Sequence, residues 1–313
     1  MQQMCRNLRI GIVGQGSQYN RISKILKIKG IKFTTYKPPR NKSYFDKEEF
    51  KELKKNNVIF ILSPNDTHLK YIKLLHANRF IFCEKPPVNK LYDLKELKKI
   101  KSNKIYFNYN FRFSKISEIL ENIKLFELKE LLYANIITGH GLAFKKDYYK
   151  SWRSNRKICK KGVFEIVSAH WIDLINYHFH IEKIQNLSLR NYTKNTNGID
   201  NSYCKILLKN NSEVNIFSSY TSPLIKKMIF VFTNGFIEQN EKYIEIRGPA
   251  MNLDKNNYFK KPKLIKRITL NENQDYDLSL KKSVTYFLEH AYKNKNFTKE
   301  SLKKSLASNN FII

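Results

Sequence analysis

Three short groups of residues carry the types and spacing needed for nucleotide binding and proton transfer. Gly14-Gln15-Gly16 follows one apolar run, and Glu84-Lys85-Pro86 follows another. A glycine turn between a strand and a helix presents backbone N–H groups to a diphosphate. A lysine held near a positive charge has a lowered pKa and can exchange a hydroxyl proton. His170 and Asp173 are three residues apart, so on a helix they share one face.

The glycine turn departs from the usual GxGxxG pattern at its third position. Tyr19 stands there, where close packing of helix on strand normally requires a small residue. A plain glycine turn is therefore the alternative interpretation. If the turn binds a cofactor, Gly14, Gly16, Ser17 and Gln18 are the residues that surround its diphosphate.

The first third of the chain alternates between strands and helices. Apolar runs predict strands at residues 9–13, 31–36, 58–62, 79–83 and 105–108. Helical spacing predicts helices at residues 17–30, 45–55, 67–77 and 91–100. Strands that alternate with helices indicate a doubly wound parallel sheet, a Rossmann domain over residues 1–120.

After about residue 120, strand-like segments follow one another directly. They lie at residues 131–138, 185–192, 203–208, 213–220, 227–233 and 243–247, with helices at 163–177 and 278–292. Turns such as Asn234-Gly235 separate them, which favours an antiparallel sheet. The predicted fold class is α/β: the parallel Rossmann sheet plus a C-terminal α+β domain with a mainly antiparallel sheet over residues 121–313. We expect the last helices to pack back on the N-terminal domain.

Further motifs follow the first ones in a definite order. These are Ser63-Pro64-Asn65-Asp66-Thr67-His68, Asn108-Tyr109-Asn110-Phe111-Arg112-Phe113, Ser151-Trp152-Arg153 and Gly162-Val163-Phe164. With Glu84-Lys85-Pro86 and His170-Trp171-Ile172-Asp173 they resemble the glucose–fructose oxidoreductase/inositol dehydrogenase (Gfo/Idh/MocA) family. Its members carry TPNxxH, EKP, a GxNxRF-like segment, WR and a glycine-rich turn before a helix bearing HxxD. The resemblance runs from about residue 8 to the C-terminus.

This resemblance implies an NAD(P)-dependent dehydrogenase or reductase that acts on a CH–OH group of a sugar, with nucleotide-linked and acidic sugars among the candidates. It makes Lys85 the residue that exchanges the hydroxyl proton, with His170 as its acid/base partner and Asp173 as a third catalytic residue. The cofactor loops comprise Ser63, Pro64, Asn65, His68, Glu84, Lys85, Pro86 and Asn110. The substrate contacts comprise Lys85, Arg112, Trp152, Arg153, Lys161, His170 and Asp173.

Departures from the family pattern leave a second function open. Ile166 stands where the family often has an acidic residue one turn before the histidine, and the adjacent Glu165 lies on another helix face. Asp173 would replace that residue if its side chain turned toward the imidazole. Together with Tyr19, Ile166 supports the alternative of a catalytically silent member that binds dinucleotide or sugar as a sensor.

Basic residues replace two other features of the family. An acidic residue about twenty positions after the glycines normally binds the ribose 2′-OH, but Lys37 stands there with Arg40 close behind. This favours NADP over NAD, unless both bases face solvent. Lys160 and Lys161 replace glycines before the His170 helix; they either contact an anionic part of the substrate or point into solvent.

The composition argues against several other classes of protein, a nucleic-acid-binding protein among them. The net charge is +31, but the lysines are dispersed, so we expect a solvated basic surface and no specific nucleic-acid site. No apolar run approaches the roughly 20 residues that cross a bilayer, so no membrane association is expected. Four scattered cysteines suit free thiols in the cytoplasm, and no metal-ligand spacing is present. The resemblance implies a homo-oligomer, either a dimer or a tetramer.

Overall fold

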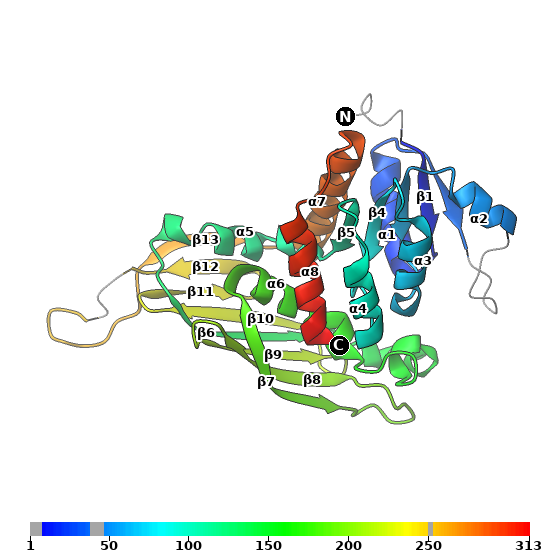
Figure 1. Ribbon diagram of the computed structural model, residues 1–313. Helices are drawn as coiled ribbons and strands as arrows, with labels where there is room; N and C mark the ends of the chain where they lie inside the picture. The colour runs from blue at the N-terminus through cyan, green and yellow to red at the C-terminus, as the bar shows by residue number, and fades with distance from the viewer. Residues whose placement is uncertain (1–7, 38–46, 250–252) are drawn as a thin grey trace. The chain divides into compact units, whose positions relative to one another are not determined.

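The computed structural model describes residues 8–37, 47–249 and 253–313 and divides into two compact units (Figure 1). The first unit comprises Met1–Asn110 together with Leu280–Ile313, and the second comprises Phe111–Ser279. The C-terminal segment therefore belongs to the same unit as the N-terminal sheet.

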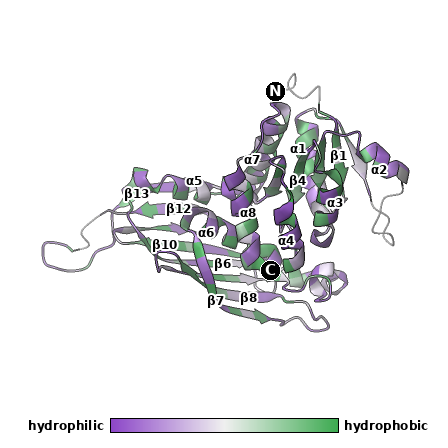
Figure 2. Ribbon diagram, in the orientation of Figure 1, coloured by the Kyte–Doolittle hydropathy of each residue, from purple (hydrophilic) through white to green (hydrophobic). Residues whose placement is uncertain are grey.

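The first unit is built on a five-stranded parallel sheet with the strand order β2-β1-β3-β4-β5. Its strands are β1 (Ile10–Val13), β2 (Phe33–Tyr36), β3 (Val58–Ile61), β4 (Phe80–Glu84) and β5 (Ile105–Asn108). Every residue of β1, β3, β4 and β5 is buried. Figure 2 shows hydrophobic stretches in β1 and β4. Continuous apolar strands are typical of parallel sheets covered on both faces, so the predicted Rossmann sheet is confirmed.

Helices connect these strands, and helices from the end of the chain complete the unit. The connecting helices are α1 (Ser17–Ile28), α2 (Lys47–Leu53), α3 (His68–Leu75) and α4 (Leu91–Lys99). Helix α8 (Lys299–Ile312), which the sequence analysis did not predict, packs against α4 and β5. From helix α7 (Glu272–Tyr292), the Phe287 ring lies 5.3 Å from the rings of both Phe60 and Phe82. Aromatic burial therefore joins the C-terminal segment to the core of the parallel sheet.

The second unit is built on an eight-stranded sheet with the order β13-β12-β11-β10-β6-β9-β8-β7. Its strands are β6 (Leu131–Gly139), β7 (Ile181–Arg190), β8 (Asn201–Leu208), β9 (Glu213–Ser219), β10 (Ile225–Phe232), β11 (Gly235–Gln239), β12 (Tyr243–Arg247) and β13 (Leu264–Thr269). All neighbours pair antiparallel except β6 and β9. The mainly antiparallel sheet is thus confirmed, although β11 and β13 were not predicted and β7 begins four residues earlier than expected.

Two elements replace the single helix predicted at residues 163–177. The segment Phe164–Ser168 is a π-helix, and α6 (Ala169–Phe179) continues from it along the sheet (Figure 1). Hydrogen bonds hold the π turn on the sheet: the Ser168 hydroxyl bonds to the hydroxyls of Ser202 on β8 at 3.1 Å and of Ser218 on β9 at 2.9 Å. Helix α5 (Lys115–Glu121), which was also not predicted, packs against α6.

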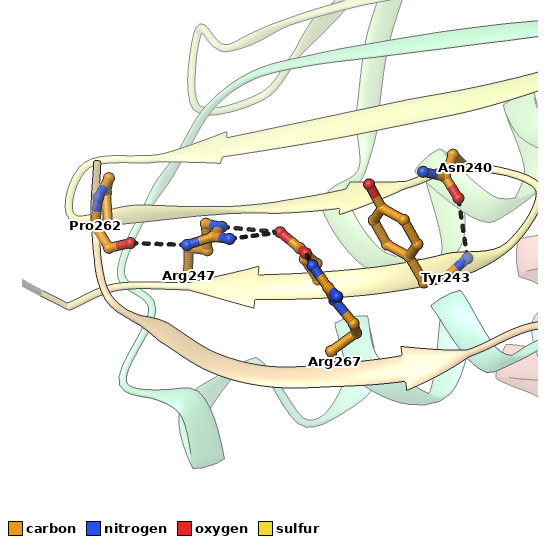
Figure 3. A network of polar contacts seen from close by, with 6 residues as sticks. Asn240, Tyr243, Arg247, Pro262 and Arg267 are labelled. Carbon is orange, nitrogen blue, oxygen red and sulfur yellow. Dashed lines mark hydrogen bonds and ion pairs between the residues drawn. The ribbon is translucent and has the colours of Figure 1, made fainter. Parts of the chain in front are cut away.

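A buried carboxylate links β12 and β13, the last two strands at one edge of the eight-stranded sheet (Figure 3). Glu245 on β12 accepts hydrogen bonds from Arg247 Nε at 2.9 Å and from Arg267 Nε on β13 at 2.8 Å. The Arg247 guanidinium also donates to the Pro262 carbonyl oxygen at 3.3 Å. These bonds, that of Arg267 foremost, lower the pKa of Glu245. They give the solvent-exposed strand β13 a fixed partner at the sheet edge.

Candidate functional site

The turn between β1 and α1 has the features of a diphosphate site. Gly14 has φ +103°, and a Cβ atom there would lie 2.8 Å from the Leu62 backbone carbonyl, so only glycine fits. Gly16 precedes α1 without a side-chain cap, and a Cβ atom on it would meet nothing within 4 Å. The first turn of α1 also holds no acidic residue. Open space in front of uncapped N–H groups fits the diphosphate of a dinucleotide.

Tyr19, in place of the third glycine, does not prevent α1 from packing on the sheet. Ile22 and Leu26 are buried on α1. The Tyr19 hydroxyl accepts a hydrogen bond from Thr35 Oγ1 on β2 at 3.2 Å. The side chain therefore extends sideways along the neighbouring strand. The substitution leaves the glycine turn intact.

Lys37 stands directly after β2 and is exposed. The end of β2 adjoins the glycine turn, because Gly14 N–H donates to the Tyr36 carbonyl oxygen at 3.0 Å. The contact of Lys37 with the adenosine end of a dinucleotide stays a prediction. Arg40 lies outside the described residues.

His68 joins the loops that follow β3 and β4. Its Nε2 lies 2.9 Å from the Ser63 carbonyl oxygen, and its Nδ1 lies 3.0 Å from that of Pro86 and 3.2 Å from that of Pro87. Burial lowers the pKa of His68, while the three carbonyl hydrogen bonds act in the opposite direction. His68 thus fixes the two loops against each other, while Pro64, one residue after Ser63, remains exposed.

Lys85 follows a buried carboxylate at the carboxyl end of β4. Glu84 Oε1 accepts from Asn108 Nδ2 at 2.7 Å, and Glu84 Oε2 accepts from Gln18 Nε2 at 3.4 Å. Burial raises the pKa of Glu84, and the Asn108 hydrogen bond and the Lys85 charge oppose this rise. Lys85 itself is half-buried, and its peptide bond to Pro86 is cis. Gln18 comes from the first turn of α1. The Glu84 carboxylate therefore links α1 to the end of β4, directly before Lys85.

A directional chain of hydrogen bonds continues from Glu84 to the C-terminal helix α7. Asn108 Oδ1 accepts from Ser283 Oγ at 2.7 Å, so the Asn108 amide must donate to Glu84. Since the Ser283 proton is used in this bond, Ser283 accepts from the Tyr106 hydroxyl at 2.7 Å. No sequence pattern predicts Ser283 in this place, because it lies 175 residues after Asn108.

In the second unit, His170 lies in an aromatic cluster. Its ring stacks on Phe111 with the centroids 4.3 Å apart and the planes 20° apart. The ring of Trp171 lies 4.6 Å from that of Phe111. The ammonium group of the buried Lys226 lies 5.8 Å from the Phe111 centroid and 5.7 Å from the Trp171 centroid. Stacking fixes the orientation of the imidazole, with a positive charge on a neighbouring aromatic face.

Asp173 forms a bidentate ion pair with Arg112. Arg112 Nε donates to Oδ2 at 2.8 Å, and a terminal guanidinium nitrogen donates to Oδ1 at 2.6 Å. Both side chains are buried, and the guanidinium also lies 5.0 Å from the Tyr177 ring centroid. Asp173 and His170 do share one helix, but both Asp173 oxygens are bonded by Arg112. The contact of Asp173 with the imidazole stays a prediction.

The turn before the π-helix needs one glycine rather than several. Gly162 has φ +52°, and a Cβ atom there would lie 1.9 Å from the Ile199 carbonyl oxygen. Lys160 is exposed, whereas Lys161 is half-buried with its ammonium group 5.6 Å from the Phe164 ring centroid. Burial lowers the pKa of Lys161. The two lysines thus have different surroundings.

The remaining predicted site residues also have definite positions. The Arg153 guanidinium lies over the Trp152 ring, 4.3 Å from its centroid, and Trp152 is partly exposed. Asn110 is buried at the end of the first unit, and Asn65 begins the short 3₁₀ turn before α3. Sequence reasoning missed Tyr148 and Tyr220, two buried tyrosines of the second unit. Both lie outside the motifs, so only burial identifies them.

Two kinds of site were also searched for among the described ranges. No group of three or more His, Cys, Asp or Glu side chains there could hold a metal ion. None of the helices in that part of the chain combines the length and apolar character needed to cross a bilayer.

Comparison with known proteins identifies the fold. No protein-family model matches the sequence, and no curated protein matches it. A levoglucosan dehydrogenase solved with NADH and levoglucosan is similar, with a TM-score of 0.76 at 12% identity over 97% of this chain and 95% of that one. A dehydrogenase from Clostridium difficile has a TM-score of 0.70 at 18% identity over 98% of both chains.

An oxidoreductase from Agrobacterium radiobacter, solved with NAD+, L-tartaric acid and magnesium, shows the same likeness. Its TM-score is 0.74 at 14% identity, over 97% of this chain and 94% of that one. The similarity therefore extends through both units. At these identities it confirms the fold that the sequence resemblance implied, the fold of dinucleotide-binding oxidoreductases.

Proposed function

We propose that this chain is an NAD(P)-dependent oxidoreductase that transfers a hydride between nicotinamide and a secondary hydroxyl or keto group of a sugar. The observation that carries the proposal is the Glu84 carboxylate, which bonds to Gln18 on the diphosphate helix and directly precedes Lys85. A glycine turn that fits a diphosphate and a lysine at the same edge of the sheet are what this reaction requires. The shared fold with a dehydrogenase solved with NADH and an oxidoreductase solved with NAD+ supports it.

Each residue contributes separately to this chemistry. The nicotinamide ring, when bound, accepts or returns the hydride. Lys85 Nζ takes up the hydroxyl proton during oxidation and returns it during reduction. His170, oriented by its stack on Phe111, donates or accepts a hydrogen bond from the substrate. Asp173 holds the Arg112 guanidinium in place, and Arg112 then acts as a substrate contact.

Lys85→Met tests this assignment. We expect turnover to fall by about two to four powers of ten, because the variant removes the proton acceptor, while dinucleotide binding survives. Free and nucleotide-linked sugars are screened with NAD and NADP, following nicotinamide absorbance, and binding is followed by NADH fluorescence. The exposed Lys90→Met is the matched control and should keep full activity. Near-normal turnover in Lys85→Met would remove Lys85 from the mechanism.

The alternative function is a sensor that binds dinucleotide or sugar without changing its redox state. Ile166 favours it, because an apolar residue stands four positions before His170, where the family often has an acidic one. A sensor would bind NADH or NADPH tightly and turn over none of the sugars in either direction. The same screen therefore separates the two functions.

A further inference from the structure

The connection between β12 and β13 carries the most exposed large apolar side chain of the described residues. Phe259 is 91% exposed, and the nearby Tyr258 and Leu253 are 71% and 43% exposed. Residues 253–263, which we call the tip, extend past the ends of both strands (Figure 1). Leu253 and Phe259 form an antiparallel bridge, so their side chains share one face of the tip. Exposed apolar groups gathered in this way mark a surface that binds another molecule.

Hydrogen bonds give the tip a defined shape. The Asp254 carboxylate accepts from the backbone N–H groups of Asn256 at 2.8 Å and Tyr258 at 3.0 Å, and the Asp254 N–H donates to the Tyr258 carbonyl oxygen at 2.9 Å. At the base of the tip, the Arg247 guanidinium donates to the Pro262 carbonyl oxygen (Figure 3). An ordered turn that presents apolar side chains to solvent is preorganised for binding.

Basic residues surround these apolar side chains. Asp254 is the only acidic residue between positions 253 and 267, and its carboxylate is used within the turn. The tip and the first residues of β13 hold the exposed lysines Lys255, Lys260, Lys261, Lys263 and Lys266. This surface is apolar and positively charged at the same time, so its charge is complementary to a partner that is negatively charged outside and apolar beneath.

The arrangement of the two rings favours a lipid surface over a nucleic acid. Phe259 is part of the bridge, and successive side chains of an extended segment point to opposite faces, so Tyr258 and Phe259 present rings on both sides of the tip. A nucleic-acid strand stacks its bases along one face and would cover only one of them. The boundary between headgroups and acyl chains surrounds a tip that enters it end-on, so it covers both rings and Leu253.

We propose that the tip binds the surface of a membrane that contains anionic lipids. Leu253, Tyr258 and Phe259 enter the boundary between headgroups and acyl chains, and the lysines contact the lipid phosphates around them. The expectation of no membrane association rested on segments that cross a bilayer, whereas binding of this kind needs no crossing segment. The proposal goes beyond the proposed function and does not depend on it, because neither substrate nor cofactor takes part.

Sedimentation of the full chain with vesicles tests the proposal. Vesicles of equal parts phosphatidylcholine and phosphatidylglycerol should bind the protein about tenfold or more tightly than phosphatidylcholine alone, because each lysine near an anionic surface adds about fivefold. Phe259→Ser should weaken binding to the anionic vesicles by about tenfold, because the ring that leaves water on binding is removed. The double variant Lys255→Gln, Lys260→Gln should also weaken it by about tenfold or more and reduce its salt dependence.

Phe259→Trp keeps the aromatic group and reports where it lies. We expect this variant to bind anionic vesicles as the wild type does, with indole emission shifted to the blue and quenched by brominated acyl chains. The shift is measured against the wild-type protein, because Trp152 and Trp171 also fluoresce. An emission spectrum that anionic vesicles leave unchanged would show that the tip stays in water, and would overturn the proposal.

Two control variants change equally exposed residues elsewhere. Leu125→Ser, at a residue 77% exposed, matches Phe259→Ser. Lys183→Gln with Lys209→Gln matches the lysine variant in charge, and Lys183 lies on β7 at the opposite edge of the sheet. Both controls should bind vesicles as the wild type does. An equal loss in the lysine control would mean that the overall positive charge binds the vesicles, and the tip would then have no special role.

The same variants identify two other occupants of the tip. Binding of a single-stranded oligonucleotide that is lost in Phe259→Ser, without any preference for anionic vesicles, would show a nucleic-acid surface. A smaller species of Phe259→Ser in sedimentation without lipid would show that a second copy of the chain covers the tip. Either result would overturn the proposal.

Discussion

His68 has an imidazole whose two nitrogens both face carbonyl oxygens. A neutral ring donates from one nitrogen only, and burial keeps the pKa of His68 below its usual value of 6.5. In the unfolded chain the same ring takes up a proton near pH 6.5. The unfolded state therefore binds more protons in this range, and the free energy of unfolding falls as the pH drops from about 7 toward the folded-state pKa.

His68→Gln should remove part of this pH dependence. We expect the variant to be less stable by about 1–3 kcal/mol at neutral pH, because buried carbonyls lose a partner. Its free energy of unfolding should then fall less steeply with decreasing pH than that of the wild type. Urea melts at several pH values measure this, with His76→Gln as the control, because among the described residues the His76 ring bonds to carbonyls of helix α3. Equal slopes in wild type and His68→Gln would contradict the assignment.

We propose that Lys37 gives the protein a preference for NADP over NAD. Lys37→Asp should weaken NADPH binding and improve NADH binding, changing the ratio of the two dissociation constants by about tenfold or more. The physical reason is that a carboxylate repels the 2′-phosphate and accepts from the 2′-OH. Lys32→Asp, an exposed site just before β2, is the control with the same charge change. An unchanged ratio, or wild-type preference for NADH, would exclude this role.

At the scale of elements, helix α7 is linked to Glu84, the residue before Lys85, by the hydrogen bonds from Ser283 to Asn108 and from Asn108 to Glu84. Ser283→Ala removes the donor that fixes the Asn108 amide, so Glu84 loses its best-oriented partner. We expect turnover to fall by about tenfold and its pH profile to move, with little change in NADH binding.

Ser283→Thr keeps the hydroxyl and should restore both properties. Ser305→Ala, a buried serine of α8 that bonds only within its own helix, is the control. A loss of stability in Ser283→Ala without any change in the pH profile of turnover would reduce Ser283 to a packing residue.

At the scale of the whole molecule, the net charge of +31 gives a field that attracts anions. The rate of NADPH association should fall by about tenfold or more between low and high ionic strength, because salt screens this field. Stopped-flow fluorescence measures the rate, and the binding of a neutral polyol is the control that salt should leave unchanged. If the association rate of NADPH does not change with salt, the net positive charge of the protein does not attract the cofactor. The homo-oligomer implied by the resemblance stays a prediction that sedimentation can test.

The sequence by itself determined the fold class and the order of the motifs. Buried parallel strands are continuous apolar runs, so β1, β3, β4 and β5 could be located directly, and Gly14 and Lys85 followed from their places after strands. Strand β13 could not be located this way, because it is exposed and depends on the ion pair of Arg267 with Glu245.

Only the tertiary structure decided which side chains are partners. Asp173 bonds to Arg112 across 61 residues, and Asn108 bonds to Ser283 across 175. The π turn, which no spacing rule predicts, sets the position of Glu165. The physical reason is that periodicity reports which face of an element is buried, a local property of the chain. Hydrogen-bond partners depend on which distant segments the packed core brings within about 3 Å.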